Sequence, residues 1–337
     1  MNPPSTQQRH PDTGRHGIAV DVGASHIRFV LATGAGKIVT EAREHVHAEG
    51  GPPAVLSQIR AGIAKLGNSL QHSDGLAGIA IGVPGGVDPQ TGKVLDANNL
   101  PGWREVDMGR ALEEAFQVPV YLDNDANMAA IGERWRGVAR GVDNFVFIAL
   151  GTGIGAGIFT DGRICRGRHG FAGELFRMNL EWSRWKDDFP DTGYLESQVS
   201  GVGLAAAGRQ LLNPGNGSGA SLAEQRDVRY LFEALREGNV QARDLVEKSF
   251  LVLGVAVANV VSILDPELVV FNGGLVQGAP DFLLETVVRV VRKIHPTPPR
   301  IELSTLSDKA QIWGALHTVF HPAELAAIRA VANSVTS

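Results

Sequence analysis

The chain has 337 residues, of which 44% are hydrophobic and 20% charged, so it is long enough for about two globular domains and is not a single small module. Its formal net charge is −5, from 31 basic and 36 acidic residues, and the basic residues are scattered singly, which argues against nucleic-acid binding. Cys165 is the single cysteine, which excludes an intrachain disulfide and a multi-cysteine zinc site.

The first sixteen residues are polar and contain proline without an apolar core. We expect them to form a disordered tail rather than a secretory signal or a membrane anchor. The longest apolar run, Leu251 to Leu264, contains glycine, asparagine and serine and is shorter than the roughly 20 residues that span a bilayer. It predicts a buried helix, and we expect a cytoplasmic protein without a membrane partner.

A unit of strand, glycine turn and hairpin occurs twice. In the first copy, the β-branched run Ile18 to Val22 leads into a turn at Gly23, and a hairpin is expected over residues 27–40. In the second, the apolar run Phe145 to Leu150 leads into a glycine-rich turn at 151–157, and a hairpin is expected over 158–165. The repeated order predicts two related lobes that face a common cleft.

The remaining segments alternate between strand and helix patterns, which indicates mostly parallel sheets. Helices are expected over residues 57–70, 108–116, 126–135, 200–212, 228–264, 280–293 and 310–319, and strands over 76–81, 118–122, 268–271 and 300–304. We place the N-terminal lobe at residues 17–123 and the C-terminal lobe at 124–309. The last helix, over residues 310–330, is expected to pack back on the first lobe.

Three glycine turns follow expected strands, at Gly23, at Gly151 to Gly157 and at Gly273-Gly274. Backbone N–H groups in such turns suit phosphate oxygens. The dinucleotide-binding spacing of glycines does not fit Gly151 to Gly157, and neither Gly36-Lys37-Ile38 nor Gly92-Lys93-Val94 is followed by the Ser or Thr of a P-loop. A single turn of this kind is explained as a tight hairpin, but the three together favour a phosphate site.

Asp125 lies where a strand is expected to run into a helix, in Asp123-Asn-Asp-Ala-Asn127. A carboxylate at that position can cap the helix or reach into a cleft. Phosphate transfer to a hydroxyl needs a carboxylate near the hydroxyl proton and phosphates neutralised by a metal. We therefore assign Asp125 as the candidate base and Asp21 as the candidate carboxylate on the Mg²⁺ side, with capping as the alternative for Asp125.

Polar side chains suited to a sugar occur at the expected ends of loops and elements. Sugar hydroxyls both donate and accept hydrogen bonds, which Asn and Glu side chains can satisfy. Such contacts are commonly made from loops. The candidates for them are Asn99, Asn124, Glu174 and Glu196.

The sequence resembles the ROK family of sugar kinases and sugar-responsive repressors over roughly residues 17 to 320. The resemblance rests on motifs that occur in the family's order: Asp21-Val-Gly-Ala-Ser-His-Ile-Arg28, Gly82-Val-Pro-Gly-Gly-Val-Asp88, Asn99-Leu-Pro-Gly-Trp103, Asn124-Asp-Ala-Asn127, Leu150-Gly-Thr-Gly-Ile-Gly-Ala-Gly157, Gly173-Glu174, Gly193-Tyr-Leu-Glu196 and Asp265-Pro-Glu-Leu-Val-Val-Phe-Asn-Gly-Gly274. It implies an α/β protein with the duplicated actin-like ATPase (ribonuclease H-like) fold. In that fold, sugar and ATP meet in a central cleft between two lobes.

The resemblance also implies roles for individual residues. Asp125 corresponds to the base that deprotonates the sugar hydroxymethyl group. The implied hexose ligands are Gly86, Asn99, Asn124, Glu174 and Glu196, and the implied nucleotide contacts are Gly23, Ser25, Gly151, Thr152, Gly153, Gly273 and Gly274. Repressors of the family carry a helix-turn-helix domain before the first strand, where this sequence has about sixteen residues, so we expect the kinase branch.

One motif of the family is missing. Glu174 is usually followed by a His and a cysteine-rich loop that bind zinc, but Arg177 stands here in place of the His and Tyr194 in place of the last Cys. We therefore expect no zinc site, and an apolar plug formed by the aromatic residues of 181–190 in its place. Arg177 is expected either to contact a sugar hydroxyl or to pair with Glu174.

These observations predict an ATP- and Mg²⁺-dependent kinase that phosphorylates a hexose, with glucose as the first candidate, at its 6-hydroxyl. By analogy with the family we expect a homodimer. An N-acetylhexosamine kinase, a glucokinase that uses polyphosphate, and a non-catalytic sugar sensor are the alternatives that the residues leave open.

Overall fold

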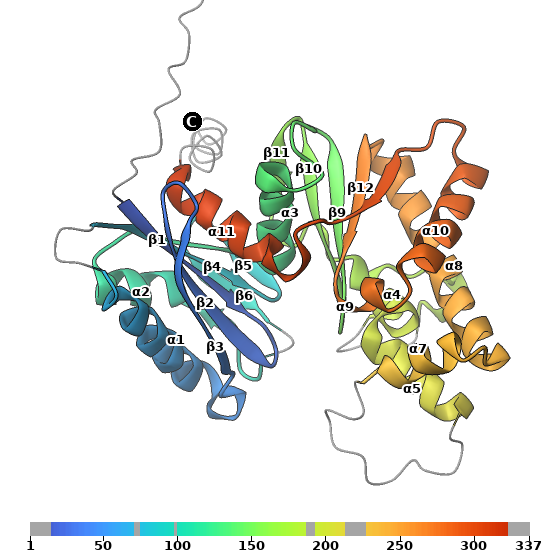
Figure 1. The fold of residues 1–337 in the computed structure, drawn as a ribbon, viewed down its shortest axis with the longest axis horizontal. Helices are drawn as coiled ribbons and strands as arrows, with labels where there is room; N and C mark the ends of the chain where they lie inside the picture. The colour runs from blue at the N-terminus through green and yellow to red at the C-terminus, as the bar shows by residue number, and fades with distance from the viewer. Residues whose placement is uncertain (1–14, 71–74, 98–99, 187–192, 213–226, 323–337) are drawn as a thin grey trace, which may run out of the picture. The chain divides into compact units, whose positions relative to one another are not determined.

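The computed structural model describes residues 15–70, 75–97, 100–186, 193–212 and 227–322. The chain divides into two compact units, one of residues up to Gly132 together with those from Gln311 onward, and one of Glu133–Ala310. Each unit contains a five-stranded mixed sheet, and helices cover each sheet (Figure 1).

The sheet of the first unit has the strand order β3-β2-β1-β4-β8. The first three strands are antiparallel neighbours, and β4 and β8 run parallel to β1. The bounds of these strands are β1 Arg15–Val22, β2 His26–Thr33, β3 Ile38–His45, β4 Gly75–Val83 and β8 Val120–Asn124.

The sheet of the second unit repeats this arrangement in the order β11-β10-β9-β12-β13. Again three antiparallel strands are followed by two that run parallel to the first strand of the unit. The bounds are β9 Phe145–Leu150, β10 Ile154–Thr160, β11 Arg163–Cys165, β12 Leu268–Asn272 and β13 Arg300–Leu303. The predicted duplication is confirmed, because both sheets have the same order and the same strand directions.

The two faces of the first sheet differ in side-chain size. One face carries large apolar residues, such as Phe29, which pack against α1 (Gly51–Gly67) and α2 (Met108–Phe116). An added Cβ at Gly62 of α1 would lie 2.3 Å from the Phe29 ring, so that helix lies directly on the sheet. The other face carries Gly17, Ala19 and Gly82, which have little or no side chain. Small residues allow helices to pack closely there.

Two helices use that space. Val319 and Phe320 of α11 (Ala310–Phe320) lie over Gly17, and the start of α3 (Asp125–Arg136) lies over Gly82. The helices cross in close backbone contact, because a Cβ at Gly314 would lie 1.7 Å from the Met128 carbonyl oxygen. Most of α3 therefore belongs to the first unit, and the boundary falls after Gly132 instead of after Asp123 as expected.

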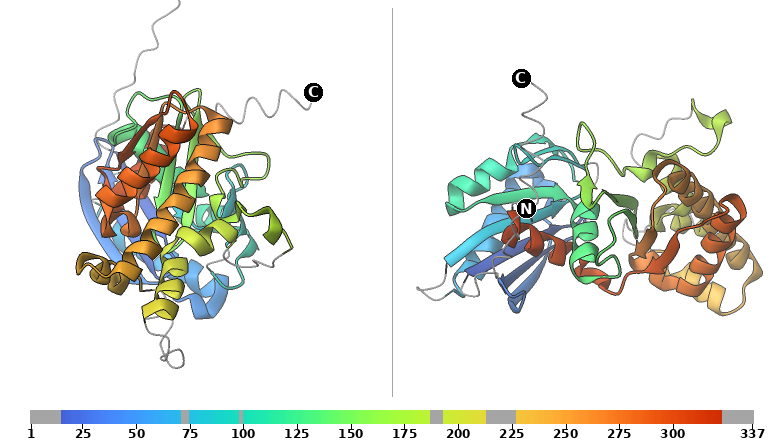
Figure 2. Two further views of the ribbon diagram at one scale, coloured as in Figure 1. Left: turned by 90° about the vertical axis from the view of Figure 1, so that its right-hand side faces the viewer. Right: turned by 90° about the horizontal axis from the view of Figure 1, so that it is seen from above.

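Two long helices, α8 (Val240–Leu264) and α10 (Pro280–Ile294), pack side by side in the second unit (Figures 1 and 2). Gly254 permits the contact, since a Cβ there would lie 2.8 Å from Val290. The second core also takes residues from α4 (Tyr194–Val199), α5 (Gly201–Leu212), α7 (Arg229–Arg236) and α9 (Gly274–Gly278).

One described helix, α8, is long and apolar enough to cross a membrane by length and composition, with a mean hydropathy of 1.7 over an 18-residue window. The helix is mostly buried, since 56% of that window lies inside the protein. A core helix passes the same test, and the side chains of Val246, Phe250 and Leu253 lie in the core of the second unit. The predicted buried helix is confirmed, and the helical stretch expected over residues 228–264 is divided into α7 and α8.

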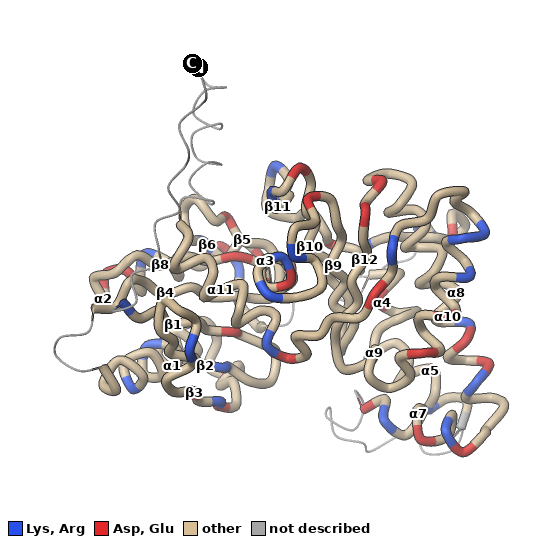
Figure 3. Tube along the Cα trace, turned by 45° about the horizontal axis from the view of Figure 1, so that its top comes forward, with Lys and Arg blue, Asp and Glu red and all other residues tan. Residues whose placement is uncertain are grey.

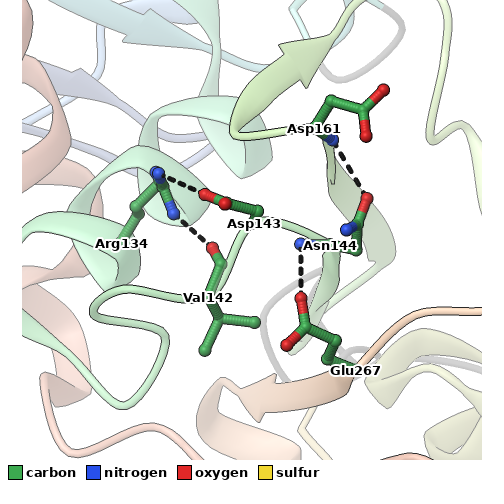
Figure 4. A network of polar contacts seen from close by, with 6 residues as sticks. All are labelled: Arg134, Val142, Asp143, Asn144, Asp161 and Glu267. Atoms are coloured by element: carbon green, nitrogen blue, oxygen red, sulfur yellow. Dashed lines mark hydrogen bonds and ion pairs between the residues drawn. The ribbon is translucent and has the colours of Figure 1, made fainter. Parts of the chain in front are cut away.

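A polar network closes the end of the second sheet at which β9 and β12 begin (Figure 4). Arg134 pairs with Asp143 at 2.7 Å and donates to the Val142 carbonyl. The backbone N–H of Asn144 donates to Glu267 at 3.3 Å, and the Asn144 side chain accepts from the N–H of Asp161 at 3.0 Å. These residues join the end of α3 to the sheet at the edge away from the glycine turns, so we assign them a structural role.

The structure departs from the predicted elements in several places. The helix expected over residues 57–70 is α1, which begins earlier, at Gly51, and ends at Gly67, and the strand expected over 118–122 is β8 at Val120–Asn124. Strand β1 begins at Arg15, so the last two residues of the expected tail belong to this strand. Strand β10 begins at Ile154, so Gly155 and Gly157 lie in a strand rather than in the turn. A third sheet of β5 (Gly86–Asp88), β6 (Lys93–Asp96) and β7 (Arg104–Val106) was not predicted, because its strands are too short to show a period.

Four 3-10 helices complete the described elements: η1 Ala48–Gly50, η2 Leu175–Arg177, η3 Trp182–Arg184 and η4 Ser307–Lys309. Basic and acidic positions are interspersed along the trace (Figure 3). The loop expected at 213–220 and most of the first sixteen residues lie outside the described part of the chain.

Candidate active site

In the first unit, polar residues gather at one edge of the sheet. Strands β1, β4 and β8 are parallel neighbours, so their carboxyl ends meet at the same edge. The register aligns Asp21 with Gly82, and Gly82 with Asp123, which places all three on one face of the sheet. Ligands of open α/β sheets bind at this kind of edge.

Asn124 and Asp125 have different roles at the start of α3. The Asn124 side-chain oxygen accepts from the backbone N–H groups of Ala126 at 2.8 Å and Asn127 at 3.2 Å. Asn124 therefore caps the helix, and the capping alternative for Asp125 is wrong. The side chain of Asn127 is held in turn by Asp123, at 2.9 Å.

The Asp125 carboxyl group is half-buried in the first turn of the helix, and its Oδ1 accepts from the N–H of Ala126 at 2.7 Å. Burial raises the pKa of this carboxyl from 3.8 to about 6, against the opposing effect of the backbone N–H groups of Ala126 and Asp125. A pKa near 6 leaves the group ionised at neutral pH and still able to take a proton. General bases in enzymes have this property.

Three further candidates of the first unit lie near Asn124 and in the turn after β1. The Asn124 amide donates to the carbonyl of Gly85 at 2.9 Å, directly before Gly86 at the start of β5. Gly23 and Ser25 lie in the turn between β1 and β2, which the N–H of Gly23 closes by donating to the His26 carbonyl at 2.9 Å. Asn99 lies outside the described residues.

The glycine turns of the second unit also share one sheet edge. The turn at Gly151 to Gly153 follows β9, and Gly273-Gly274 follows β12, its parallel neighbour. Gly273 has a φ of 124°, and an added Cβ would lie 2.3 Å from the Leu150 carbonyl oxygen, so only glycine fits. At Gly151 and Gly274 an added Cβ meets no atom within 4 Å, so open space lies beside both turns.

Glu196 of α4, one of the predicted sugar ligands, lies against the turn at Gly151 to Gly153. Its Oε2 accepts from the N–H of Ile154 at 2.9 Å and would lie 2.4 Å from a Cβ on Gly153. Burial raises the pKa of Glu196, and the Ile154 hydrogen bond opposes that rise. The N–H groups of Gly201 and Val202 donate to the carbonyls of Gly151 and Thr152, at 2.8 and 3.1 Å.

Glu174 precedes the 3-10 helix η2, which contacts both β10 and α4. The preceding Gly173 has a φ of 89°, and a Cβ there would lie 2.0 Å from the carbonyl oxygen of Ala156. Glu174 and Glu196 thus come from segments that flank the same strand. Arg177 is exposed, and its guanidinium lies 4.7 Å from the centre of the Phe176 ring.

In the described part of the segment that replaces the zinc motif, residues 181–186, no apolar plug is formed; the rest of the expected plug lies outside the described residues. Trp182 and Trp185 are 86% and 71% exposed, so they contribute no core. The Arg184 guanidinium instead lies 5.6 Å from the ring centre of the buried Tyr194. A Cβ on Gly193 would lie 2.3 Å from the Phe176 carbonyl oxygen, so η2 packs directly against the start of α4. Close backbone packing at Gly193 and the cation–π contact between Arg184 and Tyr194 join this segment to α4.

A buried carboxylate beyond these candidates was not predicted. Glu133 in α3 is fully buried, accepts from the Ser304 hydroxyl and accepts from the N–H of Val138 at 3.1 Å. Burial raises its pKa, against the effect of these two hydrogen bonds. No local pattern marks this residue, because Ser304 lies far away in the sequence and only the fold brings it close.

The chain as a whole is similar to known proteins. The model of the ROK family matches residues 17–321. A glucokinase from Halalkalibacterium halodurans is 33% identical, over 80% of this chain and 83% of its own length. A putative xylose repressor from a Caldicellulosiruptor species is 30% identical, over 90% of this chain and 77% of its own length. The crystal structure of a ROK family glucokinase from Streptomyces griseus with glucose and AMPPNP, 26% identical, matches with a TM-score of 0.73 over 89% of this chain and 98% of that one. These matches confirm the duplicated actin-like ATPase fold.

Proposed function

Because the chain belongs to the ROK family, we propose that it is a hexose kinase that transfers the γ-phosphoryl group of ATP to the 6-hydroxyl of a sugar, with glucose as the first candidate. The observation that carries this proposal is the Asp125 carboxyl, half-buried beside the Asn124 cap with a pKa raised to about 6. A sugar-binding protein without catalysis has no need of such a base.

The proposed step begins with the sugar 6-hydroxyl held against Asp125. The carboxylate accepts the hydroxyl proton as the sugar oxygen bonds to the γ-phosphorus and the bond from that phosphorus to the oxygen of ADP breaks. The protonated acid, the sugar phosphate and ADP are therefore formed together. The helix dipole favours the ionised form of Asp125 before the step, since the group lies in the first turn of α3. Burial favours the protonated form after it.

The hexose ligands in this proposal are Asn124 and the backbone at Gly86 in the first unit, and Glu174 and Glu196 in the second. Asn124 can offer only part of its amide, because its oxygen caps α3 and its N–H₂ donates to Gly85. The two glutamates are acceptors for sugar hydroxyls. Asn99 is assigned to the same role from the family resemblance, and Arg177 because it stands in place of the family's His and can donate to a hydroxyl.

The turns and Asp21 suit a magnesium-bound nucleotide. A side chain at Gly151 or Gly274 would fill the open space beside the turn. Glycine at these positions leaves the backbone accessible to a phosphate. Gly23, Ser25, Thr152, Gly153 and Gly273 complete the proposed phosphate contacts, and Asp21 is the proposed carboxylate toward Mg²⁺. When bound, MgATP supplies the phosphoryl group and the cation that neutralises its charge.

The first experiment measures ADP release from MgATP with glucose, mannose, N-acetylglucosamine and N-acetylmannosamine in turn, for the wild type and for Asp125→Ala. We expect turnover that depends on the sugar and that disappears in the variant. The same comparison with polyphosphate as donor tests the glucokinase alternative that uses polyphosphate.

A regulator that binds sugar without catalysis is the second candidate function. The relative named as a putative xylose repressor covers as much of the chain as the kinases do, which favours keeping this candidate. Sugar binding in calorimetry without turnover for any of the four sugars would establish it.

We further propose a cytoplasmic homodimer, which size-exclusion chromatography with light scattering would test.

Gly274→Ala is expected to raise the KM for MgATP by about tenfold without lowering the melting temperature, because the added methyl enters open space that a phosphate would occupy. Thermal unfolding and donor-dependent kinetics measure the two effects. Gly67→Ala serves as the control, since its added methyl also meets no atom but lies at the end of α1. An unchanged KM in Gly274→Ala would remove this turn from the nucleotide site.

A further inference from the structure

Four basic side chains lie together on one face of the first sheet. Arg28 and Arg43 face each other across β2 and β3, and His26 and His45 form the next pair on the same face. The two imidazole ring centres are 4.3 Å apart. We call these four residues the basic strip.

The basic strip begins at the turn between β1 and β2, which we propose as a phosphate-binding turn. The turn between β1 and β2 ends at His26, whose carbonyl accepts from the N–H of Gly23 at 2.9 Å, and the Ser25 carbonyl accepts from the N–H of Val46 at 3.0 Å. Arg28 is aligned in turn with Asp21 on β1. The strip, the turn and the proposed Mg²⁺-side carboxylate therefore lie on one continuous surface of a single unit.

Opposed basic side chains make this part of the sheet less stable, since like charges directly across two strands repel. Glu41 offsets Arg28 through an ion pair at 3.1 Å. Arg43 is exposed and has no ion pair with any residue in the described part of the chain. Burial lowers the pKa of His26, and the charges of Arg43 and His45 lower it further, which indicates a positive potential over the strip. An anion lying there would offset the repulsion.

We propose that the basic strip binds the phosphate chain of the phosphoryl donor, an inference that rests on the proposed kinase function. The strip extends about 7 Å along the strands and about 5 Å across them, so an extended anion can lie along it. Arg43 offers the exposed guanidinium, while the Arg28 side chain is only 15% exposed and paired with Glu41. Guanidinium groups bind phosphate oxygens with charge-assisted hydrogen bonds. A nucleoside triphosphate and inorganic polyphosphate are the two sources of such a chain.

Calorimetry of the full chain with inorganic tripolyphosphate tests the binding without any requirement for sugar phosphorylation. Arg43→Gln is expected to weaken binding by about three- to tenfold, and Glu41→Gln to tighten it, because that change removes the negative charge next to Arg28. Lys65→Gln removes an exposed positive charge from α1, which covers the opposite face, and should leave the affinity unchanged. Wild-type affinity in Arg43→Gln, or an equal loss in Lys65→Gln, overturns the proposal.

Arg43→Gln also separates this role from a structural one. Its melting temperature in buffer of low salt without phosphate is expected to rise, because the repulsion from Arg28 is removed, and its stabilisation by tripolyphosphate is expected to fall. A lower melting temperature without the phosphate would overturn the argument from repulsion.

Kinetics with saturating sugar then distinguish the two donors. A higher KM for MgATP in Arg43→Gln assigns the strip to the nucleotide, and a higher KM for polyphosphate alone assigns it to that donor. Unchanged KM values for both donors overturn the donor role. If the chain phosphorylates no sugar, the kinase proposal fails, while the calorimetry still decides whether the strip binds a phosphate chain.

Discussion

Asp125→Asn is expected to lower kcat for sugar phosphorylation by about 10² to 10⁴-fold, because the amide cannot accept the hydroxyl proton. The helix should remain intact, since Asn124 and not Asp125 caps it, and an amide oxygen can still accept from the N–H of Ala126. Steady-state kinetics of the purified variant measure the loss. Asp281→Asn is the matched control, because Asp281 is an exposed acid in the first turn of α10.

The wild-type enzyme should show the same group in its pH profile. A base with a pKa of about 6 is protonated at low pH, so kcat/KM is expected to fall tenfold per pH unit below about 6 and to level off above it. A profile that is flat between pH 5 and 8, or full activity in Asp125→Asn, would show that another group takes the proton.

Asp125→Asn is also expected to stabilise the protein at neutral pH. The folded-state pKa lies above the ordinary value of 3.8, so ionising the group costs stability progressively between about pH 4 and pH 6, and fully above that. Removing the charge recovers up to about 3 kcal/mol at pH 7 to 8 and only about 0.5 kcal/mol at pH 4. Urea unfolding at both pH values measures this, and a variant that is less stable at pH 7 would contradict the burial of the carboxylate.

Gly314→Ala is expected to lower the free energy of unfolding by about 3 to 5 kcal/mol. The added methyl would lie 1.7 Å from the Met128 carbonyl oxygen and 2.9 Å from the N atom of Gly132, and both are backbone atoms of α3. Neither can move without shifting the helix that begins at Asp125, so activity should fall together with stability. Urea unfolding and sugar-dependent turnover measure the two effects.

Gly67→Ala provides the control for this substitution as well. It places the same methyl group at the end of α1, where no atom lies within 4 Å, and a helical alanine is favoured over glycine by about 0.5 to 1 kcal/mol. We expect a small gain in stability and unchanged turnover. If Gly314→Ala were as stable as Gly67→Ala, α3 and α11 would not cross in the close contact described above.

Much of the fold follows from local patterns in the sequence. The apolar run Phe145 to Leu150 is one strand of the structure, and Met108 to Phe116 is one helix, because each has a strong period and clear ends. The repeat of strand, turn and hairpin indicated the duplication for the same reason. The short strands of the third sheet have no such period, so they could not be predicted.

The sequence also named the residues at the sheet edges but assigned some of their roles wrongly. The motif Asp123 to Asn127 marked a strand that runs into a helix, yet whether Asn124 or Asp125 caps that helix depends on side-chain directions that only the structure shows. The exposed Trp182 and Trp185 were expected to be buried, because composition shows that aromatic residues are present but not which way they face.

By itself, then, the sequence determined the α/β class, the duplication and the candidate base, since strands, turns and motifs depend on neighbouring residues. Only the tertiary structure decided which residues from distant segments meet. Strand register aligned Arg43, Arg28 and Asp21 on one face, and backbone approach at Gly314 set the position of α3. The burial that raises the pKa of Asp125 is likewise a property of the folded chain, because desolvation depends on every element packed around the group.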